Sequence, residues 1–299
     1  MTHPARPASD RDMTTIVPGE PLIAFKDVSI GFEDHEVLRG ISFEVWPGET
    51  KVLLGETGAG KTLIMKLAVG LLRADSGRIW VMGHDIGEMP ERELLDFRRH
   101  VGFVFQEGAL FDSLTVRENV AFRLNEEHMG DSEVNKRVEE VLQFVEMEPA
   151  IDLFPGELSG GMRRRVSIAR ALADRPPLVF YDSPTAGLDP VTSQTIINLI
   201  LRGRDLQGVT SLLATHRVQD AFGLARFQFD ARTDRVVPKP SNGSNSSGLE
   251  RAGAQELLDG NRPTNVLVLR DGRIYFEGAA IDVLHSSDEY LKRFLASAE

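Results

Sequence analysis

The hydrophobic and polar positions change their period several times along the chain, and each change predicts an element. Near the N-terminus, LIAFKDVSIGF and VLRGISFEVWPGE alternate apolar and polar residues, which is typical of strands with one buried face. The short apolar run ETKVLLG, ending at Gly55, predicts a buried strand, and KTLIMKLAVGLL has helical spacing up to Gly70. A strand, a glycine turn and a helix in this order form the first half of a parallel α/β unit.

Helical patterns dominate the middle of the chain, between Glu88 and Pro155. ERELLDFRRH and SEVNKRVEEVLQFVEM both place apolar residues at i, i+3 and i+4, the spacing of a helix with one buried face. We therefore interpret the stretch of about 88–175 as a helical subdomain that interrupts the α/β core. The core resumes after Leu158 with a helix, the strand LVFY, the helix SQTIINLILRGRDLQ and the strand SLLAT.

The C-terminal part predicts an insertion followed by a hairpin. Residues 231–264 contain PKPSNGSNSSG, which has the composition of a flexible low-complexity linker, and QELLDG has the spacing of a short helix. In NVLVLRDGRIYFEG, two strand patterns flank Asp271-Gly272, a pair favoured in tight hairpin turns. Residues 1–20 lack periodicity and predict a disordered tail, so the domain is expected at 21–286, with DEYLKRFL as a helix in the tail 287–299.

Composition and charge narrow the classes of function. The 299 residues suffice for one large α/β domain or two small ones, and the net charge of -11 argues against nucleic acid as a partner. The absence of cysteine excludes disulfides and thiolate metal sites. No apolar run approaches the roughly 20 residues that span a bilayer, and the N-terminus has no signal-peptide pattern. We expect a soluble protein whose membrane role, if any, comes through a partner.

The sequence GETGAGKT at residues 55–62 fits the pattern G-x-x-x-x-G-K-[ST] between a predicted strand and a predicted helix. Its glycines allow backbone N–H groups to turn inward around phosphate oxygens, and the helix N-terminus adds partial positive charge. Lys61 is expected to reach the β- and γ-phosphates, and the Thr62 hydroxyl to bind Mg²⁺. The predicted nucleotide-binding residues here are Gly55, Glu56, Thr57, Gly58, Ala59, Gly60, Lys61, Thr62 and Leu63.

Two later segments complete this chemistry. Asp182 ends the buried strand LVFYD, where a carboxylate can hold Mg²⁺ through water. LSGGM starts a helix with a hydroxyl and free N–H groups at Ser159, Gly160 and Gly161, which suits an anion. One chain does not need two such sites for one phosphate. We therefore expect these three residues to close on the γ-phosphate of a nucleotide held by another subunit.

The order GETGAGKT, Gln106, LSGGM, LVFYD, GLD, His216 resembles the nucleotide-binding subunit of ATP-binding cassette (ABC) transporters, over about residues 22–286. The resemblance implies an α/β fold of the P-loop NTPase type, with a mixed β core, an antiparallel β subdomain and a helical subdomain. It also implies ATP and Mg²⁺ as cofactors, and a dimer with a second ATPase subunit, most simply a homodimer.

The resemblance also implies roles for single residues. Phe32 looks like the aromatic residue that stacks on adenine, although a core phenylalanine is the alternative. Gln106 looks like the lid glutamine that contacts Mg²⁺ and senses the membrane subunit. Asp189 looks like the loop aspartate that crosses the dimer interface, and His216 like the switch histidine on the γ-phosphate.

A finer resemblance concerns VFQEGALFDSLTVRENVAF, the methionine of LSGGM and the ending SSDEYLKRF. These segments are similar to the ATPases of Mce-type lipid transporters, including the maintenance-of-lipid-asymmetry system. That group implies an ATPase dimer under an integral permease, peripheral on the cytoplasmic face of the inner membrane, with an Mce-domain protein as a further partner. The helical insertion after Gln106 is where such ATPases receive the coupling helix of the permease.

Ser183 departs from the family pattern, because the residue after the aspartate of LVFYD is normally a glutamate that polarises the attacking water. A serine can hydrogen-bond water but cannot take its proton at neutral pH, and losing a general base costs about 10²–10⁴-fold in rate. We expect ATP and Mg²⁺ binding and dimer closure to be retained and hydrolysis to be slow. Glu107, beside Gln106, is the candidate substitute base.

Two other function classes stay open at this point. One is a regulatory nucleotide-binding subunit with little turnover, and the other is a soluble ABC protein that acts on DNA or the ribosome. The acidic charge and the single cassette argue against the latter. The insertion at 231–264 is a second departure from the family, and is either a tolerated surface loop or a segment that docks a partner.

Overall fold

The computed structural model describes residues 19–33, 35–126, 129–239 and 263–297. Most of the predicted N-terminal tail, the predicted helix QELLDG and most of the low-complexity segment lie outside the described residues. Within the described ranges, no helix is long and apolar enough to cross a membrane.

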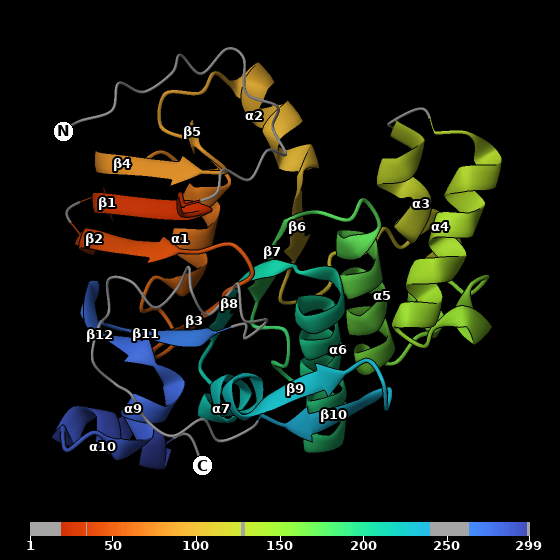
Figure 1. Ribbon diagram of the computed structural model, residues 1–299. Helices are drawn as coiled ribbons and strands as arrows, with labels where there is room; N and C mark the ends of the chain where they lie inside the picture. The colour runs from red at the N-terminus through yellow and green to blue at the C-terminus, as the bar shows by residue number, and fades with distance from the viewer. Residues whose placement is uncertain (1–18, 34, 127–128, 240–262, 298–299) are drawn as a thin grey trace.

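A six-stranded sheet forms the centre of the molecule (Figure 1). Its strands lie in the order β12 (Arg273–Ala279), β11 (Thr264–Arg270), β3 (Thr50–Leu54), β8 (Thr210–Thr215), β7 (Leu178–Asp182) and β6 (Val101–Val104). All neighbours are parallel except β12, which pairs antiparallel with β11 at the edge. The carboxyl ends of the parallel strands therefore meet at one edge of the sheet, where ligands of open α/β sheets bind.

Both faces of this sheet are buried, which explains why its strands read as continuous apolar runs. In β3, Val52 and Leu54 belong to one core cluster and Leu53 belongs to the other. The first cluster packs under α3 (Val116–Glu126), α4 (Asp131–Phe144), α5 (Gly160–Leu172), α6 (Pro190–Gln207) and α7 (Val218–Arg226). The second cluster packs under α1 (Lys61–Ala68), α2 (Glu91–Arg99) and a second sheet.

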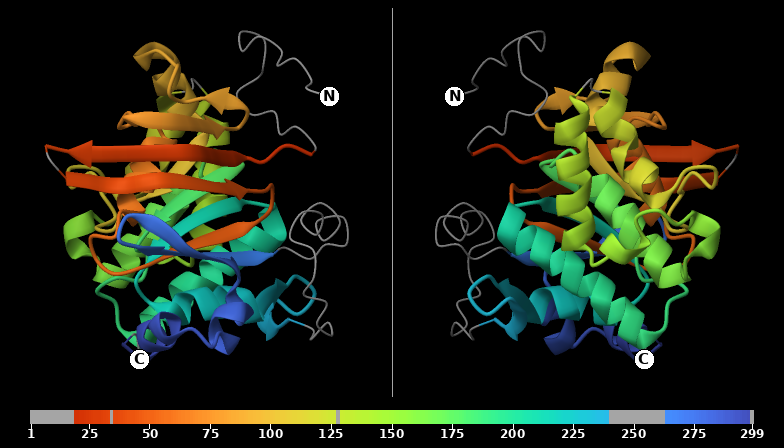
Figure 2. Two further views of the ribbon diagram at one scale, coloured as in Figure 1. Left: turned by 90° about the vertical axis from the view of Figure 1, so that its left-hand side faces the viewer. Right: turned by 90° about the vertical axis from the view of Figure 1, so that its right-hand side faces the viewer.

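The second sheet is antiparallel and has the order β2 (His35–Val45), β1 (Ile23–Phe32), β4 (Ser76–Val81) and β5 (His84–Asp85). The alternating patterns of LIAFKDVSIGF and VLRGISFEVWPGE are thus confirmed as strands. Figure 2 shows this sheet on one side of the molecule and α3, α4, α5 and α6 on the other. The predicted fold class, a mixed core with an antiparallel sheet and a helical part, is confirmed.

The expected helical subdomain at 88–175 needs a correction, because it is not one helical insertion. It contains β6, which pairs with β7 in the central sheet, and α2, whose Leu94 and Phe97 belong to the second core cluster. The four residues of β6 are too few for periodicity to separate a strand from a helix. The helices beyond β6 are α3, α4 and α5, with short 3-10 turns η2 (Glu148–Ala150) and η3 (Pro155–Glu157).

The expected low-complexity segment at 231–264 also differs at its start. β9 (Phe227–Asp230) and β10 (Arg235–Pro238) form an antiparallel hairpin there, with Val236 paired to Phe229. Valine favours strands, but these two strands have only four residues each and adjoin a long polar stretch, so the sequence pattern did not predict them. The final hairpin is as predicted: Arg270 pairs with Arg273 around a turn whose two residues have positive φ, 50° and 73°. α9 (Ala280–His285) and α10 (Glu289–Ser297) follow.

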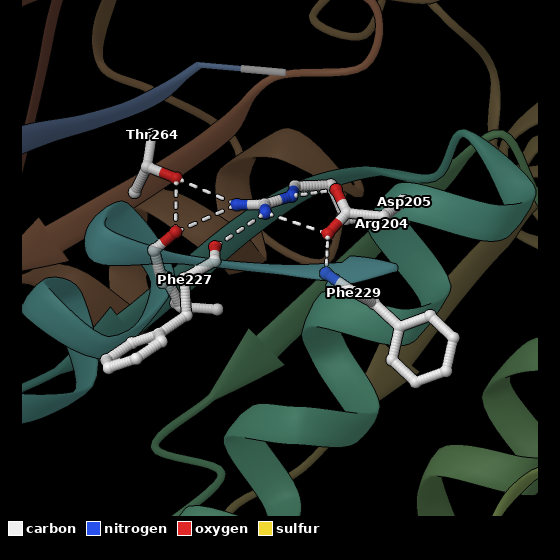
Figure 3. Close-up of polar contacts among 6 residues, drawn as sticks. Arg204, Asp205, Phe227, Phe229 and Thr264 are labelled. Carbon is white, nitrogen blue, oxygen red and sulfur yellow. Dashed lines mark hydrogen bonds and ion pairs between the residues drawn. The ribbon is translucent and has the colours of Figure 1, made fainter. Parts of the chain in front are cut away.

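A buried arginine joins the end of α6 to three other elements (Figure 3). The side chain of Arg204 is 0% exposed and forms two hydrogen bonds, of 2.7 and 3.0 Å, with the carboxylate of Asp205. Its remaining donors reach the carbonyl oxygens of Leu224 and Phe227 and the hydroxyl of Thr264. α6, α7, β9 and β11 therefore meet at one guanidinium group.

Arg204→Leu is expected to lower the free energy of unfolding by about 3–5 kcal/mol, because the mostly buried carboxylate of Asp205 loses its ion-pair partner and keeps only the hydrogen bond from the N–H of Phe229. Denaturant unfolding followed by circular dichroism measures this loss. Arg232→Leu is the control, since that side chain is 93% exposed and its ion pair with Asp230 lies in solvent. Similar losses for both variants would contradict a stabilising role for the buried pair.

Candidate functional site

The loop between β3 and α1 has the backbone that its glycines predict. Gly55, Gly58 and Gly60 have φ values of 155°, 84° and 97°, a region that favours glycine. A Cβ on Gly60 would also lie 2.5 Å from Leu38 Cδ2, so no other residue fits there without a shift. Gly60 precedes α1 and offers no side chain to cap it. The first N–H groups of α1 therefore stay available to an anionic ligand.

Lys61 lies against this loop. Its ammonium donates hydrogen bonds of 2.7 Å to the carbonyl oxygens of both Gly55 and Glu56. Burial lowers the pKa of Lys61, and the carboxylates of Asp182 and Glu56 act in the opposite direction. The loop thus combines a cation with unpaired helix N–H groups, and this combination suits a phosphate.

The two predicted magnesium ligands from distant parts of the chain are in contact. Thr62 Oγ1, on α1, donates a hydrogen bond of 2.9 Å to Oδ2 of Asp182, at the end of β7. Mg²⁺ prefers oxygen ligands such as hydroxyl and carboxylate groups. The phosphates of a bound nucleotide ordinarily supply further ligands. Within the described ranges, no cluster of three or more acidic or histidine side chains forms a separate metal site. The residues therefore fit magnesium bound together with a nucleotide.

Ser183 follows Asp182 in a strained conformation, with a φ of 47°. Its hydroxyl donates to Oδ1 of Asp182 at 3.3 Å, and its N–H donates to the carbonyl of Ala214 on β8 at 2.8 Å. Position 183 is half-buried beside Asp182, the predicted magnesium ligand, and its side chain is a neutral hydroxyl.

A buried carboxylate that the sequence analysis missed lies beside the predicted switch histidine. Asp220, on α7, is 2% exposed and accepts hydrogen bonds from the hydroxyls of Thr185 at 2.6 Å and Thr215 at 2.8 Å. Burial raises the pKa of Asp220, while these bonds and the charges of Arg217 and His216 lower it. His216 itself is exposed. Asp220 therefore links the loop after β7 to the end of β8.

The residues Ser159, Gly160 and Gly161 of LSGGM, which we call the signature turn, lie beside the start of α6. Ser159 caps α5 by accepting a hydrogen bond from the N–H of Met162 at 3.2 Å. A Cβ on Gly161 would lie 2.4 Å from Cγ2 of Thr192, so this glycine allows close packing of α5 on α6. Asp189 caps α6 and accepts the Thr192 hydroxyl, a contact that is the largest cause of its lowered pKa. The structure thereby places the signature turn beside Asp189.

The remaining predicted site residues are exposed. Phe32, at the end of β1, is 50% exposed, so it is not a core phenylalanine. Gln106 and Glu107 follow β6 in an exposed loop, and the carbonyl of Gln106 accepts a hydrogen bond from Arg164 of α5. Arg164 was missed because three consecutive arginines follow LSGGM, and nothing in the sequence distinguishes the buried one.

The sequence profile described as ABC transporter matches residues 38–186. This range includes the phosphate-binding loop at residues 55–62, the signature turn and Asp182. The methionine import ATP-binding protein MetN of Rhizobium johnstonii is 40% identical over 244 residues, covering 82% of this chain and 67% of that protein. The intermembrane phospholipid transport system ATP-binding protein MlaF of Haemophilus influenzae is 33% identical, covering 72% of this chain and 82% of that protein. The chain belongs to the ABC transporter family of ATP-binding subunits.

Solved structures agree with this ABC assignment. A dimeric post-hydrolysis state of an ATP-binding cassette bound to ADP and Pi has a TM-score of 0.66 and 25% identity, covering 86% of this chain and 98% of that one. cbiO1 from Clostridium perfringens has a TM-score of 0.71 at 24% identity, covering 89% and 91%, and shows the same fold. ABC ATP-binding subunits bind ATP, typically with Mg²⁺, generally hydrolyse it, and work as dimers with membrane permease subunits.

Proposed function

We propose that two copies of this chain close around ATP and thereby power a membrane transporter, with hydrolysis slowed at Ser183. The observation that carries the proposal is the hydrogen bond between Thr62 and Asp182 beside the Lys61 loop. In this proposal Lys61 and the first N–H groups of α1 hold the phosphates, Phe32 stacks on adenine, and Thr62, Asp182 and Gln106 hold magnesium. Bound magnesium would neutralise phosphate charge. His216 would contact the γ-phosphate.

The dimeric arrangement is supported by the exposed signature turn. Ser159 and Gly160 are exposed at the N-terminus of α5, and Asp189 is exposed beside them at the N-terminus of α6. The N-terminus of α5 and the Ser159 hydroxyl suit an anion that arrives from outside the chain, whereas the carboxylate of Asp189 already caps α6. We infer that this anion is the γ-phosphate of the nucleotide bound by the second copy.

A groove beside α3 supports a permease as the membrane partner. The groove has a volume of about 410 Å³ and is lined by Leu114, Glu118, Phe122, Asn125 and Glu126. Phe111 and Phe122 are both exposed, and their ring centroids are 4.7 Å apart. Exposed aromatic residues next to a hollow mark a protein interface. We propose that the coupling helix of the permease lies here, on the cytoplasmic face of the inner membrane.

Phe122→Asp is expected to reduce the permease recovered with the chain from detergent-solubilised membranes at least tenfold, because it replaces the exposed aromatic ring beside Phe111 with a charge. ATP affinity should stay within about twofold, since the groove holds no phosphate-binding residue. Leu95→Asp is the matched control: Leu95 is 57% exposed on α2, away from the groove. Recovery of the permease by both variants alike would place the interface elsewhere.

For the cargo, we propose lipid, handled outside the inner membrane by an Mce-domain partner. The support is the likeness to MlaF and the segments 104–122 and 286–294. Other cargoes remain alternatives, because the chain is also similar to MetN and to the sulfate/thiosulfate import protein CysA of Methylococcus capsulatus. CysA is 35% identical, covering 79% of this chain and 64% of that protein. The test is transport by the permease complex in phosphatidylethanolamine–phosphatidylglycerol vesicles. ATP-dependent movement of a fluorescent phospholipid is expected, and methionine or sulfate uptake instead would overturn the lipid proposal.

Ser183 also supports a second candidate, a regulatory subunit with little turnover of its own. Its neutral hydroxyl lies where the family normally has a carboxylate. Single-turnover kinetics separate the two candidates. Slow hydrolysis that a second ATPase subunit does not accelerate would favour the regulatory one.

A further inference from the structure

The loop that carries Gln106 is held by α5. Two nitrogens of the Arg164 guanidinium donate hydrogen bonds to the carbonyl oxygens of Phe105 and Gln106. Arg164 is only 5% exposed, although it lies five residues after the exposed Ser159. A planar guanidinium presents its donors in a fixed geometry, so two neighbouring carbonyls bound to it are constrained together.

Two more side chains of α5 bind the same loop. The hydroxyl of Ser167 and the guanidinium of Arg170 both donate to the carbonyl of Gly108, at 3.0 and 3.1 Å. Arg164, Ser167 and Arg170 are spaced by three residues and thus share one face of the helix. Gly108 and Ala109 have positive φ values of 82° and 47°, so the loop turns sharply where α5 holds it. Its position therefore follows that of α5.

Arg164 also interacts electrostatically with Asp182, a predicted magnesium ligand. Burial lowers the pKa of its guanidinium, and the carboxylates of Asp182 and Glu107 act in the opposite direction. Asp182 is the residue that contacts Thr62, so Arg164 lies within electrostatic reach of the site that its own chain provides for magnesium. Arg164 thus lies on α5, forms hydrogen bonds with the loop of Gln106 and interacts electrostatically with Asp182.

We propose that Arg164 is a positioning residue that transmits movement of the signature turn to Gln106. When the turn at Ser159 binds the nucleotide of the second copy, α5 moves as a rigid body and carries the loop of Gln106 with it. Each copy thereby adjusts its own magnesium site in response to the nucleotide of the other copy. This inference rests on the proposed sandwich dimer.

The test measures the Mg²⁺ concentration that gives half-maximal ATP-induced dimerisation. We expect Arg164→Gln to raise it about tenfold, within the usual range of coupling between sites, and to leave ATP affinity without Mg²⁺ unchanged. Arg164→Lys keeps the charge but loses the planar guanidinium that binds two carbonyls. Its Mg²⁺ requirement is expected to lie between those of the wild type and Arg164→Gln. Arg165→Gln is the matched control, because Arg165 also donates to backbone carbonyls, those of Val145 and Glu146, but does not touch the loop.

A double-mutant cycle with Gln106→Ala separates positioning from general damage. If Arg164 acts through Gln106, adding Arg164→Gln to Gln106→Ala changes the Mg²⁺ requirement by less than about twofold. If the two substitutions instead multiply their effects on the Mg²⁺ requirement, the inference about Arg164 is wrong. An equal shift in Arg165→Gln would also overturn it. Neither result would affect the proposed function. A wild-type chain that binds no ATP would overturn the proposed function, and this inference with it.

Discussion

Ser183→Glu is expected to raise the ATP turnover of the chain about 10²–10⁴-fold, because it supplies the general base that the hydroxyl cannot. Ser183 already has a φ of 47°, so glutamate replaces one non-glycine residue by another in the same strained backbone. Its half-buried side chain is directed at Asp182, the carboxylate that contacts Thr62. A carboxylate at this position would therefore lie beside Asp182, the proposed magnesium ligand.

Phosphate release under saturating Mg²⁺ and ATP, with the permease present, measures the effect. Ser183→Gln is the control, since glutamine has the length of glutamate but cannot accept a proton at neutral pH. An equal gain from both variants would mean that water is positioned and not deprotonated at residue 183. Wild-type turnover of about 1 s⁻¹ or more would contradict the expectation that hydrolysis is slow.

Lys61→Ala is expected to weaken ATP binding and to reduce turnover about 10²–10³-fold, the usual loss when a preorganised donor to developing charge is removed. The ammonium of Lys61 is the cation held against the loop by the carbonyls of Gly55 and Glu56. Fluorescence titration with a labelled ATP analogue measures the affinity.

Lys66→Ala gives the matched comparison for Lys61, because Lys66 lies on the same helix but is exposed. It is expected to leave affinity and turnover unchanged. Thermal unfolding of both variants separates a loss of binding from a loss of structure. Unchanged ATP affinity in Lys61→Ala would show that the phosphates bind elsewhere.

Local backbone requirements explain what the sequence predicts well. The glycines of the phosphate-binding loop and the Asp271-Gly272 turn have positive φ, and such positions favour glycine, so they can be recognised in the sequence. Long periodic segments, such as those of α4 and α6, are equally readable. These patterns predicted most strands of the central sheet, most of its helices and the candidate nucleotide site.

Features that depend on tertiary contacts were not predictable. β6 has four residues and is a strand only because it pairs with β7. Arg164 and Asp220 look like ordinary surface charges in the sequence, and only packing shows that both are buried against backbone or hydroxyl partners. The roles of Phe32 and the other site residues stay predictions, since their ligands lie outside the chain.

The hydrogen bonds of Arg204 fix the chain on both sides of the stretch between β10 and β11, which we expect to tolerate changes in length. The guanidinium binds the carbonyl of Phe227 before this stretch and the hydroxyl of Thr264 after it. Next to the undescribed residues, the N–H of Lys239 donates to Arg226, and the carbonyl of Pro263 accepts from Thr50. Both ends are thus anchored independently of what joins them, and doubling a loop's length costs only about 0.6 kcal/mol. Evolution can lengthen or shorten this stretch, and a protein engineer can fuse a reporter domain there, without moving the nucleotide site.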